Sequence, residues 1–129
     1  MIEVTAAIIR ENDRFMICRR PAHKARGGLW EFPGGKLEKG ETYEQCLARE
    51  CREELNVELA VGEEYMTLVH EYPDITIKLH VYNARIASGE IKLLEHSELA
   101  WITPREIDGY SFCGADTDVL AKLKTEAGK

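Results

Sequence analysis

The strongest structural constraint in this sequence is the segment from Thr42 to Asn56, which carries both a start signal and a stop signal for an α-helix. Thr42 is followed three residues later by Gln45, the spacing of a capping box. Asn56 stands where a helix commonly ends in the left-handed conformation, which asparagine tolerates. An apolar stripe recurs at four-residue steps through Leu47, Cys51 and Leu55. The pattern therefore predicts a helix over 43–55 with one face in a hydrophobic core.

The same helix carries three glutamates at i, i+3 and i+4. At this spacing Glu50, Glu53 and Glu54 should converge on one side of the helix. Clustered carboxylates are typical ligands of Mg²⁺ or Mn²⁺, although a solvated acidic face is the commoner explanation for a Glu-rich helix taken alone. A glycine turn at Gly34 and Gly35 favours a functional site, because glycine lets backbone groups approach a metal or a phosphate closely.

The residues around this helix alternate in the manner of β-strands. A second capping box at Thr103 indicates a short helix, and Asp116 could cap a C-terminal helix. The strands predicted from two-residue periodicity cover 2–9, 15–18, 57–61, 65–68, 75–82 and 99–102. Strands followed by a helix, more strands and a final helix predict an α/β fold with a mixed sheet flanked by helices. The length of 129 residues suits one domain, 1–129.

Composition narrows the class of protein. The chain has a net charge of −6, which argues against binding to nucleic acid polymers through a broad basic face. Basic residues nevertheless dominate from Arg14 to Lys36 and acidic residues from Glu38 to Glu54, as suits a phosphate held beside a divalent cation. No apolar run is long enough to span a membrane and no signal peptide is evident. Four cysteines without a C-x-x-C pair favour reduced thiols and a cytoplasmic protein.

Residues 35–57 resemble the signature of the Nudix hydrolases, G-x5-E-x7-R-E-U-x-E-E-x-G-U, in which U is aliphatic. Two positions depart from it, because Cys51 replaces an aliphatic residue and Asn56 replaces the last glycine. Both changes are mild, since cysteine packs as a small hydrophobe and asparagine tolerates the left-handed conformation. The resemblance implies a Nudix-type α/β/α sandwich with a mixed β-sheet and a loop-helix-loop catalytic motif. The matching residues are Gly35, Glu41, Arg49, Glu50, Glu53, Glu54 and Val57.

The resemblance also implies roles for individual residues. Glu50 would be a metal ligand and the candidate general base, although a loop residue could serve as the base instead. A further acidic ligand is expected from a late loop, where Glu95 is favoured over Glu98 by its spacing from Trp101. Arg49 and Glu41 would orient the carboxylates. Of these two, Arg49 is predicted to be a catalytic residue. The implied metal ligands are the Gly34 carbonyl, Glu50, Glu53, Glu54 and Glu95.

The flanking sequence resembles the MutT branch of the family and the bacterial CTP pyrophosphohydrolases within it. Arg20 and Lys36 would contact phosphate, and Tyr72 could stack on a base. Asp116 would recognise the base, and a role as helix N-cap is the equally weighted alternative. An ionised aspartate only accepts hydrogen bonds, so as a base contact it favours cytosine or adenine over guanine. The four histidines show no ligand spacing and receive no role. The substrate-binding residues implied are Arg20, Glu31, Phe32, Lys36, Tyr72, Asp74 and Asp116.

These features predict a Mg²⁺-dependent enzyme, with Mn²⁺ as a substitute, that hydrolyses a (deoxy)nucleoside triphosphate to the monophosphate and pyrophosphate in nucleotide-pool housecleaning. The partner would be a small nucleotide, with no nucleic acid polymer and no membrane, and the chain would be a monomer or a homodimer. The alternatives are an oxidised-guanine triphosphatase, a hydrolase of dinucleotides such as ADP-ribose, and a nucleotide sensor without activity. The physiological nucleotide stays open, because a few pocket contacts decide it.

Overall fold

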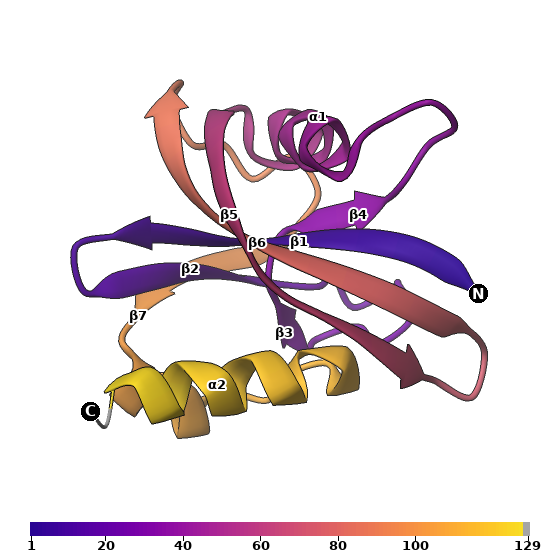
Figure 1. The fold of residues 1–129 in the computed structure, drawn as a ribbon. Coiled ribbons are helices and arrows are strands. Elements are labelled where there is room, and N and C mark those ends of the chain that lie inside the picture. Colours follow the sequence, from indigo (N-terminus) through magenta and orange to yellow (C-terminus); the bar gives the residue numbers. More distant parts are fainter. Residues whose placement is uncertain (128–129) are drawn as a thin grey trace.

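The computed structural model describes residues 1–127 and places one seven-stranded mixed sheet between helices (Figure 1). The path of paired strands runs β3-β2-β1-β6-β5, with β4 paired to β1 and β7 paired to β2. The pairing of β1 with β6 is parallel and the other pairings are antiparallel. The strands are β1 Ile2–Glu11, β2 Arg14–Arg19, β3 Trp30–Glu31, β4 Gly34–Lys36, β5 Glu58–Glu71, β6 Thr76–Ser88 and β7 Glu98–Ile102. The helices are α1 Tyr43–Leu55 and α2 Thr117–Ala127, with 3₁₀ turns η1 Pro104–Gly109 and η2 Gly114–Asp116.

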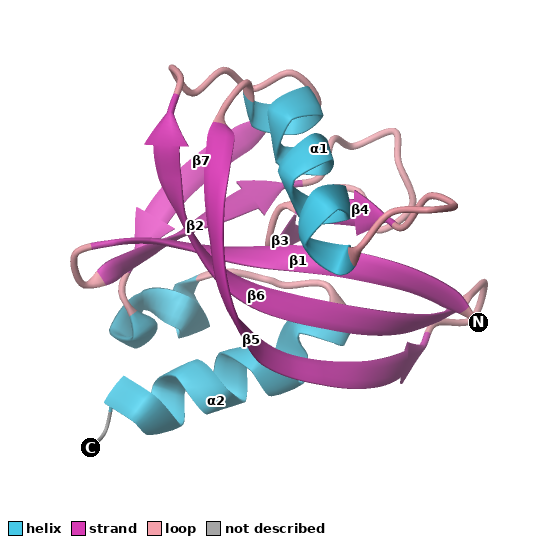
Figure 2. Cartoon of the chain, turned by 45° about the horizontal axis from the view of Figure 1, so that its top comes forward, coloured by secondary structure: helices cyan, strands magenta, loops and turns pink. Residues whose placement is uncertain are grey.

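The strand β1 divides the interior into two cores, one on each side of the sheet. Ala6 and Ile8 point into the core that α2 closes, whereas Ala7 and Ile9 point into the core that α1 closes. This alternation follows from the two-residue period of a strand that is buried on both faces. Figures 1 and 2 show α1 and α2 on opposite sides of the sheet, and the α/β/α arrangement predicted from the sequence is therefore confirmed.

The helix α1 forms as its local signals predict. The Thr42 hydroxyl accepts the Gln45 backbone N–H at 3.1 Å, and the Gln45 side chain accepts the Thr42 N–H at 2.9 Å. Asn56 closes the helix in the left-handed conformation, with φ 61°. Its side-chain amide donates to the Glu90 carbonyl at 3.0 Å. The end of α1 is thereby joined to the 89–97 loop.

Other predictions needed correction. The two strands predicted over 57–61 and 65–68 are one continuous strand, β5, whose register against β6 shifts near Glu64. Gly34 and Gly35 lie in the short strand β4 rather than in a free turn, because β1 pairs with them. Thr103 and Glu106 form the predicted capping box, but the turn it starts is the 3₁₀ turn η1. No helix within residues 1–127 is long and apolar enough to cross a membrane.

Candidate active site

A pocket of about 550 Å³ lies where β4, α1, the 20–28 loop, the β5–β6 turn and the 89–97 loop meet. Every site residue predicted from the sequence lines it except Arg49 and Glu53. Residues far apart in the chain are therefore brought to one cavity. The predicted residues in its wall are Arg20, Glu31, Phe32, Gly34, Lys36, Glu50, Glu54, Tyr72, Asp74, Glu95 and Asp116.

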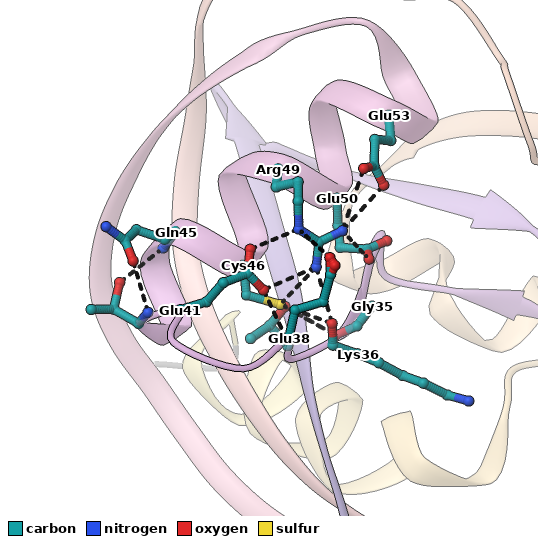
Figure 3. Close-up of polar contacts among 11 residues, drawn as sticks. Gly35, Lys36, Glu38, Glu41, Gln45, Cys46, Arg49, Glu50 and Glu53 are labelled. Atoms are coloured by element: carbon teal, nitrogen blue, oxygen red, sulfur yellow. Dashed lines mark hydrogen bonds and ion pairs between the residues drawn. The ribbon is translucent and has the colours of Figure 1, made fainter.

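Arg49 lies outside the pocket wall and hydrogen-bonds to three glutamates, with a fourth, Glu38, at 3.5 Å (Figure 3). Its guanidinium donates to both Glu41 oxygens at 2.7 and 3.0 Å, to Glu50 Oε1 at 2.8 Å and to Glu53 Oε2 at 3.2 Å. A further bond reaches the Lys36 carbonyl at 3.1 Å and ties the helix to β4. The hydrogen bond from Arg49 lowers the pKa of Glu41. The planar guanidinium thus fixes where the Glu50 carboxylate stands.

Glu54 is in a very different environment from Glu41. Its residue is 4% exposed, and burial, with the adjoining Glu50 carboxyl as the next cause, raises its pKa well above the usual range. Its one ion-pair partner within residues 1–127 is His96, whose Nδ1 lies 3.8 Å from Glu54 Oε1. Two adjoining carboxyl groups with little basic compensation form a donor set that a hard divalent cation would stabilise.

The acidic cluster does not by itself enclose a metal. Within the part of the chain that the structure describes, no three His, Cys, Asp or Glu side chains are grouped closely enough to hold an ion. Glu53, expected to converge with its neighbours, has a side chain that is 54% exposed and stands outside the pocket wall. A cation beside Glu50 and Glu54 would therefore complete its coordination with backbone carbonyls, water or substrate oxygens, as Mg²⁺ usually does.

Gly35 is required by the close approach of β4 to the Glu50 carboxylate. A Cβ atom at this position would overlap the Glu50 carboxyl group, and one at Gly34 would overlap the Thr5 carbonyl. Gly34 and Gly35 are thus explained by the packing of β4 against β1 and α1. They allow the Glu50 carboxylate and the β4 backbone to border the same space.

The late loop brings Glu95, and not Glu98, to the pocket. Glu95 lines the cavity and pairs with Lys24 across it at 3.5 Å. Glu98 lies on β7 and pairs with Arg19 at 2.8 Å, outside the pocket wall. The placement favours the predicted choice of Glu95 as the additional acidic residue.

Glu31 also lines the pocket, and both of its carboxylate oxygens are held. Arg20 Nη1 donates to Glu31 Oε1 at 3.1 Å, and His96 Nε2 lies 2.9 Å from Glu31 Oε2. Sequence reasoning missed His96, because the ring is separated from Glu31 by 65 positions and no local spacing connects them. Its burial within the pocket wall could be found only from the fold.

Tyr72 is only partly available as a stacking surface. The Arg26 guanidinium lies over the Tyr72 ring, 4.0 Å from its centroid, and pairs with Asp74 at 3.0 Å. The Tyr72 hydroxyl accepts the Ala115 N–H at 2.9 Å. Arg26 therefore covers part of the surface that was expected to receive a base.

Asp116 directly precedes α2, the position that an N-cap takes, and is also the last residue of the 3₁₀ turn η2. Its carboxyl is buried in the pocket wall and accepts a backbone N–H from Phe32. Burial, followed by the nearby charge of Glu31, raises the pKa of Asp116 well above its usual range. The sequence argument assumed an ionised aspartate, whereas a carboxyl that keeps its proton can donate a hydrogen bond as well as accept one.

We expect the buried Asp116 to make the protein less stable as the pH rises. The folded chain holds a proton that the unfolded chain releases above pH 3.8, so the free energy of unfolding falls from there up to the folded pKa. Asp116→Asn should remove up to about 1.4 kcal/mol per pH unit of this slope. Urea unfolding of both proteins with EDTA at pH 5 to 8 measures the difference. Parallel pH profiles would show that Asp116 is ionised in the folded protein.

Comparison with known proteins agrees with this geometry. A NUDIX domain model matches residues 4–122. The CTP pyrophosphohydrolase of Escherichia coli is 40% identical over 93% of this chain and 89% of its own, and the 8-oxo-dGTP diphosphatase of that species is 34% identical over 95% and 96%. The solution structure of the E. coli ORF135 protein superposes with a TM-score of 0.82 at 38% identity, over 97% of this chain and 89% of its own. The MutT protein of Methanosarcina mazei gives 0.86 at 26% identity, over 99% and 96%. A signature helix, the cavity beside it and these matches over nearly the whole chain together make this protein a hydrolase of the Nudix family.

Proposed function

We propose that this Nudix hydrolase converts nucleoside triphosphates to monophosphates and pyrophosphate with Mg²⁺, and that cytosine nucleotides are its preferred substrates. The observation that carries the proposal is the pair of adjoining carboxyls, Glu50 and Glu54, in a pocket that also contains basic side chains. Arg20, Lys24, Arg26 and Lys36 line this pocket. A pocket wall that holds both adjoining carboxyls and basic side chains suits a polyphosphate held beside a divalent cation.

Glu50 and Glu54, with the Gly34 carbonyl and Glu95, are the residues that would hold the cation. Glu53 lies outside the pocket wall and is held by Arg49, and it would join them as a further ligand. When bound, Mg²⁺ supplies charge neutralisation of the phosphates and lowers the pKa of an attacking water. The Arg49 guanidinium keeps Glu50 Oε1 in place at 2.8 Å, so the other Glu50 oxygen can accept a proton.

In the reaction a water oxygen forms a bond to a phosphorus of the triphosphate, and the bond between that phosphorus and the bridging oxygen of the leaving pyrophosphate breaks. The proton of the water passes to Glu50, acting as general base. Arg20 and Lys36 contact the phosphates and balance the charge that moves to the leaving pyrophosphate. The general base is assigned to Glu50 because Arg49 orients it, whereas Glu95 is held only by an exposed pair with Lys24.

The base would be recognised by Glu31 and Asp116. Glu31, fixed between Arg20 and His96, offers acceptors for an exocyclic amino group such as cytosine N4. The raised pKa of Asp116 favours its protonated form, which would offer one donor and one acceptor, and these suit cytosine but also the O6 and N1–H of guanine. Asp116 therefore does not exclude guanine, and the preference for cytosine rests on Glu31 and on the 40% identity to the CTP pyrophosphohydrolase.

A second candidate is hydrolysis of oxidised guanine triphosphates. The raised pKa of the buried Asp116 favours it, because a protonated carboxyl could donate a hydrogen bond to a guanine O6. The relative named as an 8-oxo-dGTP diphosphatase, at 34% identity, points the same way.

Pyrophosphate release from a nucleotide panel tests both candidates. The panel should contain CTP, dCTP, 5-methyl-dCTP, ATP, GTP and 8-oxo-dGTP, each with Mg²⁺ and with EDTA. ADP-ribose, whose hydrolysis yields AMP and ribose 5-phosphate instead of pyrophosphate, should be followed by AMP formation. We expect kcat/KM for the cytosine nucleotides to exceed the others by about tenfold, the effect of one well-placed base contact. The highest kcat/KM with 8-oxo-dGTP would establish the second candidate. Nucleotide binding without any pyrophosphate release would identify a sensor and reject the proposal.

A further inference from the structure

His96 is the one histidine in the pocket wall, and no role follows for it from the signature residues. Its side chain is 5% exposed and lies between two carboxylates. Nε2 is 2.9 Å from Glu31 Oε2, and Nδ1 is 3.8 Å from Glu54 Oε1. The ring therefore stands between the residue proposed to contact the base and a residue proposed to hold the cation.

The Nδ1 atom of His96 is buried and has no hydrogen-bond partner among residues 1–127. Buried polar atoms without a partner are uncommon in folded proteins, because the lost hydration is not repaid. Nδ1 lies 3.8 Å from Glu54 Oε1, and a shift of about 1 Å would bring these two atoms to hydrogen-bond distance. The ring is thus aimed at Glu54 from a fixed position.

The backbone on both sides of His96 is anchored independently of its ring. The Leu94 N–H donates to the Glu54 carbonyl at 3.0 Å, and the Ser97 N–H donates to the Arg19 carbonyl at 3.0 Å. These bonds join the 89–97 loop to the end of α1 and to β2. A substitution of the His96 side chain should consequently leave the loop in place.

We propose that His96 is a positioning residue, which holds Glu31 through Nε2 and Glu54 through Nδ1. Glu31 has its other oxygen on Arg20, so the ring completes a clamp on that carboxylate. Glu54 has no arginine or lysine partner within the described residues, and His96, at 3.8 Å, is its one ion-pair partner there. One imidazole then sets both the selectivity for the base and the affinity for the cation. This inference rests on the proposed function, which assigns those roles to Glu31 and Glu54.

Three substitutions separate the two contacts. In His96→Gln the side-chain amide reaches the position of Nε2 and can keep the contact with Glu31. In His96→Asn the amide takes the position of Nδ1 and can keep the contact with Glu54. His96→Ala should weaken Mn²⁺ binding by about 10- to 100-fold, as loss of such partners does, and lower base selectivity as well. We expect His96→Asn to restore the Mn²⁺ affinity alone and His96→Gln to restore the selectivity alone. Electron paramagnetic resonance titration of Mn²⁺ without nucleotide measures the first, and the ratio of kcat/KM for CTP and GTP measures the second.

A matched control is His23→Gln, which changes an exposed histidine outside the pocket wall and should alter neither quantity. Thermal unfolding of every variant tests for a merely structural role. Equal losses of Mn²⁺ affinity and selectivity in all three variants, in step with a lower Tm, would overturn the inference, and so would three variants that match the wild type. If the wild type neither binds Mn²⁺ nor releases pyrophosphate, the proposed function has failed instead.

Discussion

Glu54→Gln should lower kcat/KM for the preferred nucleotide by about a thousandfold, the factor that corresponds to several kcal/mol of lost transition-state stabilisation. The substitution keeps the shape of the side chain and removes a carboxylate proposed to hold Mg²⁺. Steady-state pyrophosphate release with saturating Mg²⁺ measures the loss. Glu63→Gln, at an exposed position of β5, is the matched control and should retain wild-type activity.

The Glu54→Gln variant should also be more stable than the wild type at pH 8 in EDTA. Burial and the adjoining Glu50 raise the folded pKa of Glu54 above the value of 4.5 for a free glutamate. The folded protein therefore binds a proton more tightly than the unfolded chain, and its free energy of unfolding decreases as the pH rises above 4.5. Glutamine has no such proton to lose, so the decrease should be smaller in the variant.

Thermal unfolding with and without Mg²⁺ completes the test. The wild type should gain Tm on addition of Mg²⁺, because ligand binding stabilises the folded state, and Glu54→Gln should lose most of that gain. Turnover near the wild-type level, with an unchanged response to Mg²⁺, would show that Glu54 does not hold the cation.

Arg49→Ala should produce the largest loss of stability among the site variants, about 3 kcal/mol in the free energy of unfolding. The guanidinium is mostly buried and neutralises Glu41, Glu50 and Glu53 together, so its removal leaves clustered carboxylates without a partner. Activity should also decrease by at least tenfold to a hundredfold, because Glu50 loses the group that orients it. Urea unfolding and pyrophosphate release measure the two effects.

Arg49→Lys distinguishes geometry from charge. A lysine keeps one positive charge but cannot make the two parallel bonds to Glu41 while it also reaches Glu50. We expect intermediate stability and a loss of activity close to that of Arg49→Ala. Arg105→Lys, at an exposed position of η1, is the control. Full activity in Arg49→Lys would mean that charge alone suffices and that Arg49 does not orient Glu50.

Much of the scaffold could be predicted because its signals are local. The capping box at Thr42, the left-handed Asn56 and the four-residue stripe all act within a few positions of one another, and α1 has the bounds they indicate. The alternation of β1 likewise needs no partner to be recognised. By contrast, β5 was divided in two because its apolar pattern breaks where its register against β6 shifts, and a pairing shift leaves no clear local signal.

The sequence alone determined the signature helix, the layered fold and eleven of the residues in the pocket wall, through local spacing and through its resemblance to the Nudix family. Only the tertiary structure decided how those residues act on one another. It separated Glu95 from Glu98, laid Arg26 over Tyr72, buried Asp116 deeply enough to raise its pKa and set His96 between Glu31 and Glu54. Each of these depends on the distance between segments that the sheet brings together and on the water that their packing excludes, and neither quantity is encoded in local spacing.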